Sequence, residues 1–400
     1  MIKNDITKYL LLALIILSAT FYYGAYALGT IFFLGLFLRD RKGIMEIAKS
    51  DKSILLMGAA LLLSTFTSKS LYYSLLVDSV ILLHFMIYIV MVKTIDRNRV
   101  EDLLQIMNLV GIALCLYGVY QYFTGDLTVA NSWTDQNTFG NLIRIYSTLR
   151  NPNIFAAYLT FNICFAGAYL VKKKADIYAA INIMLSSICL VLTYSRGGFV
   201  SFVAAMLVLM LLCRERKVLV YTIFMVAFYY GYDMIENINR ADLSKLLADS
   251  SSLYRLEIWR ASFGMFKQNI LFGCGPGSVM KLVSYSTEQI KGFVSHSHNL
   301  EIQLLAETGL VGLGAFGFMV YTGLRNAFRF YWINKNNESS YVAIGFIAAI
   351  TAMLVHGVVD CTILIPTRSL LFLIYLALFP AMNYKSSKKE TLEPISYLAC

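Results

Sequence analysis

The sequence predicts an all-α integral membrane protein, with about 12 transmembrane helices in a single polytopic domain covering residues 1–400. Hydrophobic residues make up 58% of the chain and charged residues 14%, whereas soluble proteins contain about 25% charged residues. The mean hydropathy is +0.63. Apolar runs of membrane-spanning length recur along the chain, and short segments rich in Lys and Arg separate them.

The individual spans follow from the apolar runs, because a span needs about 20 apolar residues, fewer where it is short. Residues 9–38 form one run that is too long for a single perpendicular span at about 1.5 Å per residue. We therefore expect a tight hairpin at Tyr23-Gly24. The predicted spans are 9–23, 25–38, 53–67, 71–92, 103–123, 153–171, 177–193, 198–213, 217–232, 309–331, 340–359 and 364–382.

The distribution of basic residues supports this count and predicts the orientation. With the N-terminus inside, every inner segment carries at least two Lys or Arg, whereas the short outer turns carry at most one each, namely Lys69, Arg196 and Arg368. Because basic loops stay on the cytoplasmic side, both termini are expected to be cytoplasmic. The net charge of +10 then indicates contact with anionic lipid rather than with nucleic acid.

Two outer segments are long. The first outer loop covers residues 124–152, and the long extracytoplasmic loop covers residues 233–297. Within the second, residues 252–268 are expected to form an amphipathic helix on the outer face, because their apolar residues recur at helical spacing, namely Leu253, Leu256, Trp259, Phe263 and Phe266. The run Gly273–Gly277 lacks the Lys-Ser/Thr of a nucleotide-binding loop and is expected to be a turn.

Arg196 is the strongest single candidate for a functional residue. It lies between two apolar runs and is followed by two glycines. A charge at that depth is costly, so function is the default hypothesis, although snorkelling to the outer headgroups is the alternative. Several arginines on one outer face suit an anionic ligand, because guanidinium binds phosphate oxygens bidentately. No ATP or nucleotide sugar is available there, so the expected phosphate is a lipid pyrophosphate.

The stretch from Ser295 to Gly312 marks the change from polar to apolar sequence and contains His296 and His298. A histidine there can take the proton from an attacking hydroxyl. In the alternative interpretation, Ser297 or Asn299 caps a helix and the histidines are interfacial. The outer face has no Asp-x-Asp and no metal-ligand spacing, so we expect no metal and no cofactor, and arginines would stabilise a leaving pyrophosphate.

The remaining unusual residues have simpler interpretations. Asp78 and His84 lie in one predicted span, six residues apart, and are expected to form buried hydrogen bonds rather than a paired proton relay. The seven cysteines show no Cys-x-x-Cys spacing, which does not favour a structural zinc site. A disulfide between Cys274 and Cys361, both expected outside, is left open.

Several motifs together resemble one family. The pattern His298-Asn299, nine residues, then Gly309-x-x-Gly312 resembles the signature of the O-antigen ligase and polymerase superfamily. Other pieces match it in order between about residues 140 and 365. These are Arg150-Asn151-Pro152-Asn153, Tyr194-Ser195-Arg196-Gly197-Gly198, Arg255 to Trp259 followed by Leu271 to Gly277, and His356-Gly357-Val358-Val359-Asp360.

The resemblance implies a metal-independent, inverting membrane glycosyltransferase of the GT-C type in cell-envelope polysaccharide biosynthesis. Such an enzyme transfers a glycan en bloc from undecaprenyl pyrophosphate to an acceptor hydroxyl on a glycan or glycolipid. By position, Arg196 and Arg255 would bind the pyrophosphate and His298 would activate the acceptor. The other polar candidates on that face are expected to bind substrate, namely Arg150, Asn153, Arg260, His296, His356 and Asp360.

The expected location is the plasma or inner membrane, with the active site on the extracytoplasmic face. The motifs do not separate a ligase from a polymerase that joins lipid-linked repeat units of a capsule, O-antigen or wall polysaccharide. Whether the host has an outer membrane also stays open. A transporter of polysaccharide or lipid is the competing class, with a scaffold role below it. A transporter would be expected to show inverted repeats and discontinuous helices at the midplane, and the sequence shows neither.

Overall fold

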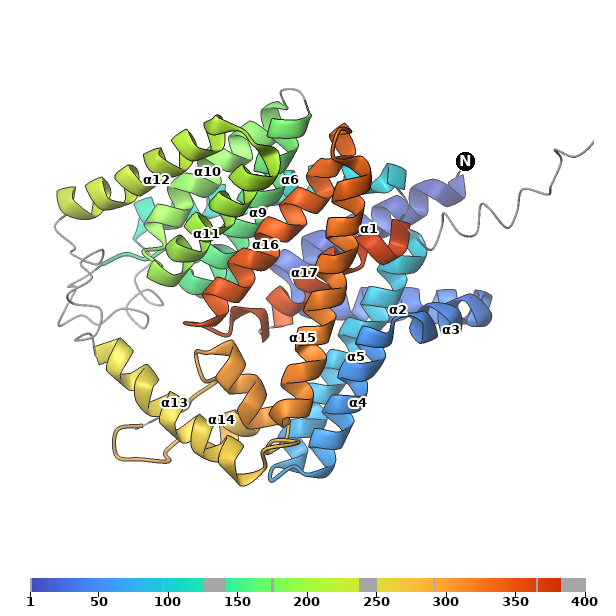
Figure 1. Ribbon diagram of the computed structural model, residues 1–400, viewed down its shortest axis with the longest axis vertical. Coiled ribbons are helices and arrows are strands. Elements are labelled where there is room, and N and C mark those ends of the chain that lie inside the picture. The colour runs from blue at the N-terminus through green and yellow to red at the C-terminus, as the bar shows by residue number, and fades with distance from the viewer. Residues whose placement is uncertain are drawn as a thin grey trace, which may run out of the picture.

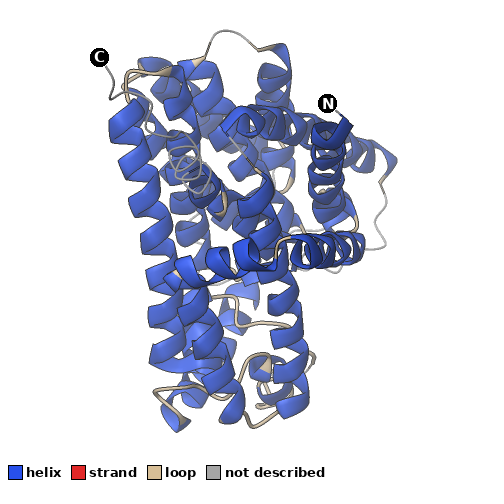
Figure 2. Cartoon of the chain, turned by 90° about the vertical axis from the view of Figure 1, so that its right-hand side faces the viewer, coloured by secondary structure: helices blue, strands red, loops and turns tan. Residues whose placement is uncertain are grey.

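The part of the chain that the computed structural model describes consists mainly of helices joined by loops, and Figure 2 shows no strand in that part. The described residues are 2–95, 97–125, 142–173, 176–236, 250–290, 292–364 and 366–382. Most of the predicted first outer loop, part of the long extracytoplasmic loop and the C-terminal segment lie outside these ranges.

Each predicted span falls on a helix of the structure (Figure 1). These helices are α1 (Ile2–Thr20), α2 (Tyr22–Arg39), α4 (Lys52–Phe66), α5 (Leu71–Thr94), α6 (Arg97–Thr124), α9 (Pro152–Lys172), α10 (Ile177–Leu192), α11 (Arg196–Cys213), α12 (Arg216–Ile235), α15 (Leu300–Asn334), α16 (Tyr341–Gly357) and α17 (Pro366–Leu376). Three further α-helices are α3 (Arg41–Ser50), α13 (Ser250–Gln268) and α14 (Ser278–Leu282), and the 3₁₀ turns are η2 (Ser147–Leu149), η4 (Glu338–Ser340) and η5 (Thr362–Leu364).

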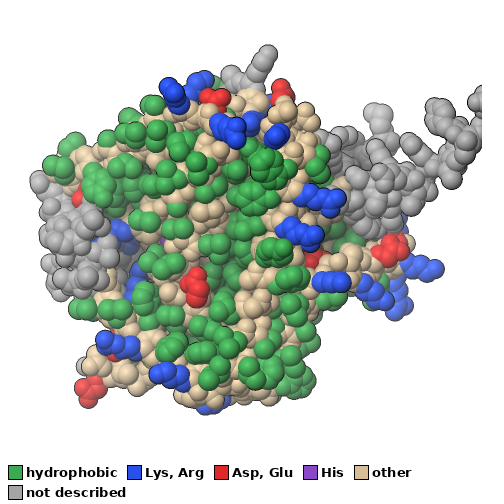
Figure 3. All heavy atoms as spheres, in the orientation of Figure 1, with side chains coloured by type: hydrophobic (Ala, Val, Ile, Leu, Met, Phe, Trp, Pro, Cys, Tyr) green, Lys and Arg blue, Asp and Glu red, His purple; other side chains and the backbone are tan. Residues whose placement is uncertain are grey.

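The helix lengths confirm a multi-pass membrane protein. Within the described residues, seven helices are long and apolar enough to cross a membrane, and three shorter apolar helices accompany them at Lys52–Phe66, Ile177–Leu192 and Ser369–Met382. The count of about 12 spans stays a prediction. In Figure 3, hydrophobic side chains cover most of the visible face, and Lys and Arg lie mainly towards its edges.

The break in the first apolar run differs from the prediction by two residues. Helix α1 ends at Thr20 and α2 begins at Tyr22, so the chain turns at Phe21 rather than at Tyr23-Gly24. Gly24 remains helical, and a Cβ on it would lie only 2.7 Å from the ring of Phe21. The glycine therefore makes room for the aromatic side chain at the turn and does not itself break the helix.

Helices α9 and α16 form the centre of the bundle. Both are 83% buried within their most apolar window, and apolar residues all round a helix are typical of such a position. Small residues allow close approach: a Cβ on Gly345 of α16 would lie 2.7 Å from Phe165 of α9. Likewise a Cβ on Gly198 of α11 would lie 2.5 Å from Ala156 of α9. This packing brings the N-terminal ends of α9 and α11 together.

Helix α15 is interrupted at Gly309, which has φ 63° and ψ −163°. The break leaves the next backbone N–H groups without partners in their own helix. The N–H of Leu310 donates to the carbonyl of Ile270 at 2.9 Å, and the N–H of Val311 donates to that of Leu271 at 3.1 Å. A Cβ on Gly309 would lie 2.3 Å from the Leu271 oxygen. Only glycine fits this contact, which explains the first glycine of the Gly-x-x-Gly motif.

The turn predicted at Gly273–Gly277 is confirmed, and it docks on the same break. The N–H of Cys274 donates to the carbonyl of Ala306, and the N–H of Gly275 donates to that of Glu307, both at 2.9 Å. All three glycines of the run have positive φ, a conformation that glycine adopts without steric cost. The glycine-rich run is therefore a backbone partner for α15.

The long-loop helix predicted at residues 252–268 is present as α13. Its side towards the protein carries buried residues outside the predicted apolar stripe, including Ile258 and Met265. Three stripe residues, Leu253, Leu256 and Phe263, are exposed. The stripe thus faces outward in part, as expected for a helix that lies against a membrane surface. Figure 1 shows α13 and α14 at the lower end of the molecule, away from α9–α12.

The structure shows the hydrogen bonds of His84 and Asp78 and the state of the described cysteines. His84 is buried and lies within hydrogen-bonding distance of Tyr26 (3.1 Å) and Ser369 (2.8 Å), and Thr65 donates to Asp78 at 2.6 Å. The predicted buried hydrogen-bonding role is confirmed for His84. The described cysteines, which include 274 and 361, are buried free thiols, so the disulfide is not formed.

Candidate active site

The C-terminal end of α16 is where several distant segments meet. The carbonyl of Val359 accepts a hydrogen bond from Arg255 of α13 at 3.0 Å. The neighbouring carbonyl of Val358 accepts one from the side chain of Asn299 at 2.9 Å. Asp360 follows directly and is 4% exposed. Carbonyls at a helix end have no partners within the helix, so side chains from elsewhere satisfy them here.

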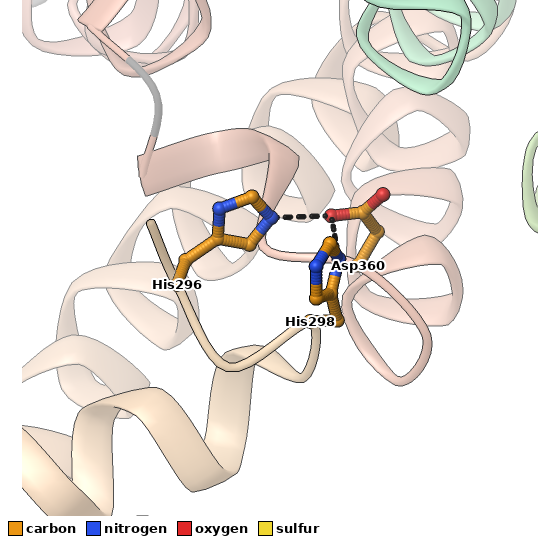
Figure 4. Close-up of side chains that lie close together, drawn as sticks. All are labelled: His296, His298 and Asp360. Carbon is orange, nitrogen blue, oxygen red and sulfur yellow. Dashed lines mark hydrogen bonds and ion pairs between the residues drawn. The ribbon is translucent and has the colours of Figure 1, made fainter. Parts of the chain in front are cut away.

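Asp360 contacts two histidines, and we call His296, His298 and Asp360 the His–Asp cluster (Figure 4). His296 Nε2 lies 3.1 Å from Asp360 Oδ1, and His298 Nδ1 lies 3.5 Å from the same oxygen. The centroids of the two imidazole rings are 4.2 Å apart. The side chains of His296 and His298 are 15% and 25% exposed. The two histidines can thus meet a ligand, whereas Asp360 acts through them.

Local sequence places the histidines. The side chain of Asn299 caps α15 by accepting a hydrogen bond from the N–H of Ile302 at 2.9 Å, and the N–H of Ser297 donates to Gln303 at 2.6 Å. His298 has φ 55°, an uncommon conformation that often accompanies function. Asn299 is therefore a helix cap, as one interpretation held, but the histidines are also directed at a buried carboxylate.

Asn153 fixes the orientation of Asp360. Its Nδ2 donates to Asp360 Oδ2 at 2.8 Å. Its Oδ1 accepts from Arg144 at 3.0 Å and from the hydroxyl of Ser195 at 2.9 Å. These two donors decide which end of the amide faces the carboxylate. Arg144 is buried and also donates to the carbonyl of Thr193 at 2.8 Å. The chain of contacts from Arg144 to the histidines forms one polar network.

Burial and charge set the protonation of the cluster. Burial lowers the pKa of His298 below its usual value, although Asp360 opposes that shift. Burial by itself would raise the pKa of Asp360, but the contacts with His296 and His298 outweigh it and hold that pKa well below its usual range. Asp360 is therefore ionised and His298 neutral near pH 7. The carboxylate favours the proton on His298 Nδ1, which leaves Nε2 as an acceptor.

Arg196 lies beside the same helix end. It is the first residue of α11, and Ser195 caps that helix. A Cβ on the next residue, Gly197, would lie 2.6 Å from Val359 and 3.2 Å from His356. The turn that carries Arg196 is therefore packed directly on the end of α16. His356 is buried, and its ring borders this turn.

Two predicted site residues have other neighbours among the described residues. Arg150 is exposed and interacts electrostatically with Tyr22 of α2. Arg260 is 74% exposed and forms an ion pair with Glu257, one turn away on α13. Their predicted roles in substrate binding stay predictions. The sequence does not single out Arg144, because it lies outside the motifs, whereas Arg150 directly precedes Asn151-Pro152-Asn153.

The cluster also has the chemistry of a metal site. One ligand atom from each of its residues lies within 4.8 Å of the other two. The sequence shows no metal-ligand spacing, because Asp360 is far from the histidines along the chain. The fold brings them together, and imidazole and carboxylate groups are ordinary zinc ligands.

A comparison with known families identifies the region that carries the histidines. Residues 181–317 match a family model described as O-antigen ligase. This segment of the chain is similar to the O-antigen ligase and polymerase superfamily. The resemblance in the motifs is thereby confirmed, and the matched O-antigen ligase segment includes Arg196, Arg255, His296 and His298. No curated protein matches the chain.

Proposed function

We propose that this protein transfers a glycan en bloc from undecaprenyl pyrophosphate to an acceptor hydroxyl at the extracytoplasmic face of the plasma or inner membrane. The observation that carries the proposal is the His–Asp cluster. It pairs two histidines of the O-antigen ligase segment with a buried, ionised aspartate. Arg255 donates a hydrogen bond to the carbonyl of Val359, the residue before that aspartate.

His298 is the proposed general base. Its Nε2 accepts the proton of the acceptor hydroxyl as that oxygen attacks the anomeric carbon of the donor sugar. The carbon–oxygen bond to the pyrophosphate breaks from the opposite side, so the configuration inverts. Asp360 stabilises the imidazolium that forms, as the carboxylate of a catalytic triad does. The negative charge of Asp360 and its 3.5 Å contact with His298 Nδ1 support this assignment.

Arg196 and Arg255 are the proposed partners of the leaving pyrophosphate. Guanidinium groups stay charged and bind phosphate oxygens in pairs, so they can stabilise the charge that develops as the pyrophosphate departs. Arg255 uses one of its donors for the carbonyl of Val359, which fixes the side chain at the end of α16. On this mechanism the reaction requires no metal ion.

Transfer by the purified protein tests the proposal. We expect a lipid-pyrophosphate glycan to be joined to an acceptor, with release of undecaprenyl pyrophosphate, and we expect EDTA not to lower the turnover. Two acceptors separate the alternatives: a glycolipid acceptor identifies a ligase, and a second lipid-linked repeat identifies a polymerase. Movement of intact donor across vesicles without bond cleavage would instead identify a transporter. Activity lost in EDTA and restored by magnesium would contradict metal independence.

The proposed orientation, with both termini cytoplasmic, has a direct test. Ser286 and Asn336 are both exposed, in the long extracytoplasmic loop and after α15 respectively. In a Cys400→Ser background we expect a membrane-impermeant maleimide to label Ser286→Cys on spheroplasts, and Asn336→Cys only after permeabilisation. The described native cysteines are buried and give a low background. The reverse pattern would invert the orientation.

A further inference from the structure

We propose that the His–Asp cluster is also a binding site for a divalent transition-metal ion of the zinc class, and that the bound ion inhibits the enzyme. The ligands are His296 Nε2, His298 Nδ1 and Asp360 Oδ1. The binding step stands on the geometry of these three residues alone. The inhibition rests on the proposed role of His298.

The spacing of the three atoms fits a single ion. Bonds of about 2.0–2.1 Å in tetrahedral geometry separate ligand atoms by roughly 3.3–3.4 Å. The two contacts with Asp360 Oδ1 are 3.1 Å and 3.5 Å, close to that value. The distance between the two histidine nitrogens is at most 4.8 Å. A modest rotation of one ring closes it, and both rings are partly exposed. Three protein ligands leave a fourth position open for water.

Two of the three proposed ligands also have hydrogen-bond partners that fix their orientation. Ligating imidazoles and carboxylates usually form a second hydrogen bond that fixes their orientation. Here Asn153 donates to Asp360 Oδ2 at 2.8 Å, and His296 Nδ1 lies 2.7 Å from the hydroxyl of Ser295. When Nδ1–H donates to that hydroxyl, the lone pair of His296 Nε2 faces the shared centre. Each of these two ligands therefore already has an outer partner.

The charge balance allows a cation. Asp360 is a buried carboxylic acid, and the two histidines are the only described groups that pair with its Oδ1. Arg255 acts electrostatically on His298 and opposes a positive ion. Its guanidinium is held at the carbonyl of Val359. Two neutral imidazoles and one carboxylate leave a +1 charge on the zinc complex, less than the ion carries in water.

A bound metal ion would prevent His298 from acting as the proposed general base. A neutral imidazole carries one proton on one of its two nitrogens. With the ion on His298 Nδ1, that proton must sit on Nε2, which then has no lone pair for the acceptor hydroxyl. The same carboxylate that favours the productive tautomer in the empty site therefore favours the ion when one is present.

Binding is measured first and without turnover. The full chain carries a histidine-free affinity tag and Cys400→Ser, and Co²⁺ is added as a spectroscopic substitute for zinc. We expect one Co²⁺ per chain, with the intense visible bands of a four-coordinate site, displaced by Zn²⁺. His296→Ala and Asp360→Asn should each weaken binding by more than the roughly 10–100-fold typical of lost outer-shell partners. Asn153→Ala should fall within that range.

His84→Gln is the matched control, because His84 is a buried histidine outside the cluster. It should bind Co²⁺ as the parent does. Size-exclusion elution and helical content verify that every variant is folded. Unchanged binding in both His296→Ala and Asp360→Asn, or the absence of a four-coordinate spectrum in the parent, would overturn the proposal.

Inhibition is the second measurement. Zn²⁺ should lower glycan transfer by the parent, with EDTA restoring it, and the residual transfer of His296→Ala should be less sensitive to Zn²⁺. One Co²⁺ bound without any effect of Zn²⁺ on transfer would overturn the inhibition and leave the metal site standing. Absence of transfer in every condition would count against the proposed function instead, since the spectrum reports binding independently.

Discussion

Replacing His298 by alanine is expected to lower the turnover of glycan transfer by about 10²–10⁴-fold, the usual contribution of a positioned general base. Binding of the lipid-pyrophosphate donor should remain, because Arg196 and Arg255, rather than His298, are the proposed contacts of the phosphates. Turnover with a purified donor and a binding titration on the same preparation measure the two effects separately. An equal loss of binding and turnover would mean that His298 holds the donor and is not a base.

His296 provides the internal comparison. It lies in the same loop before α15 and is nearer to Asp360 than His298 is, at 3.1 Å against 3.5 Å. His296→Ala is expected to cause the smaller loss, because His296 lies outside the His-Asn pattern. If His296→Ala is inactive and His298→Ala is active, the base is assigned to the wrong histidine. If both remain active, the pyrophosphate departs without general base assistance.

The second large effect is expected at Arg196. Arg196→Lys keeps the positive charge but loses the planar pair of donors that matches a phosphate. We expect turnover to fall by about 10²–10³-fold, the scale found when one donor to a developing negative charge is removed. Membrane insertion should be unchanged, which detergent extraction and size-exclusion elution can verify.

Arg329→Lys is the control for that substitution. Arg329 is exposed on α15 and lies at the end predicted to be cytoplasmic, so the same chemical change there should leave turnover within about twofold, as surface substitutions usually do. Near-normal turnover in Arg196→Lys would exclude a bidentate role, and Arg196 would then be a residue that snorkels to the headgroups.

Local rules predicted much of the site. The helices that carry the motifs begin where the sequence places capping residues: Asn151 caps α9 ahead of Pro152, Ser195 caps α11, and Asn299 caps α15. Asparagine and serine favour that position because their side chains accept from the first free N–H groups. Since each cap lies beside a candidate site residue, sequence alone could locate the helix ends that surround the candidate site.

Contacts between residues that lie far apart in the chain could not be predicted from such local rules. Asp360 was predicted as a substrate-binding residue, but its partners His296 and Asn153 are joined to it only by the packing of α9, α16 and the chain before α15. The role of Arg144 depends on the same packing. The ion pair of Arg260 with Glu257, by contrast, follows from local sequence, because an acidic residue three positions before an arginine on a helix favours such a pair.

The break of α15 at Gly309 has a consequence for how the protein is made. Unsatisfied backbone groups inside a bilayer cost several kcal/mol each, and the N–H groups of Leu310 and Val311 find their acceptors at Ile270 and Leu271. Those acceptors are synthesised before α15 leaves the ribosome. The segment that carries Ile270 and Leu271 must therefore fold back onto α15 before these two N–H groups find acceptors, so this helix is completed by a part of the chain that is made before it.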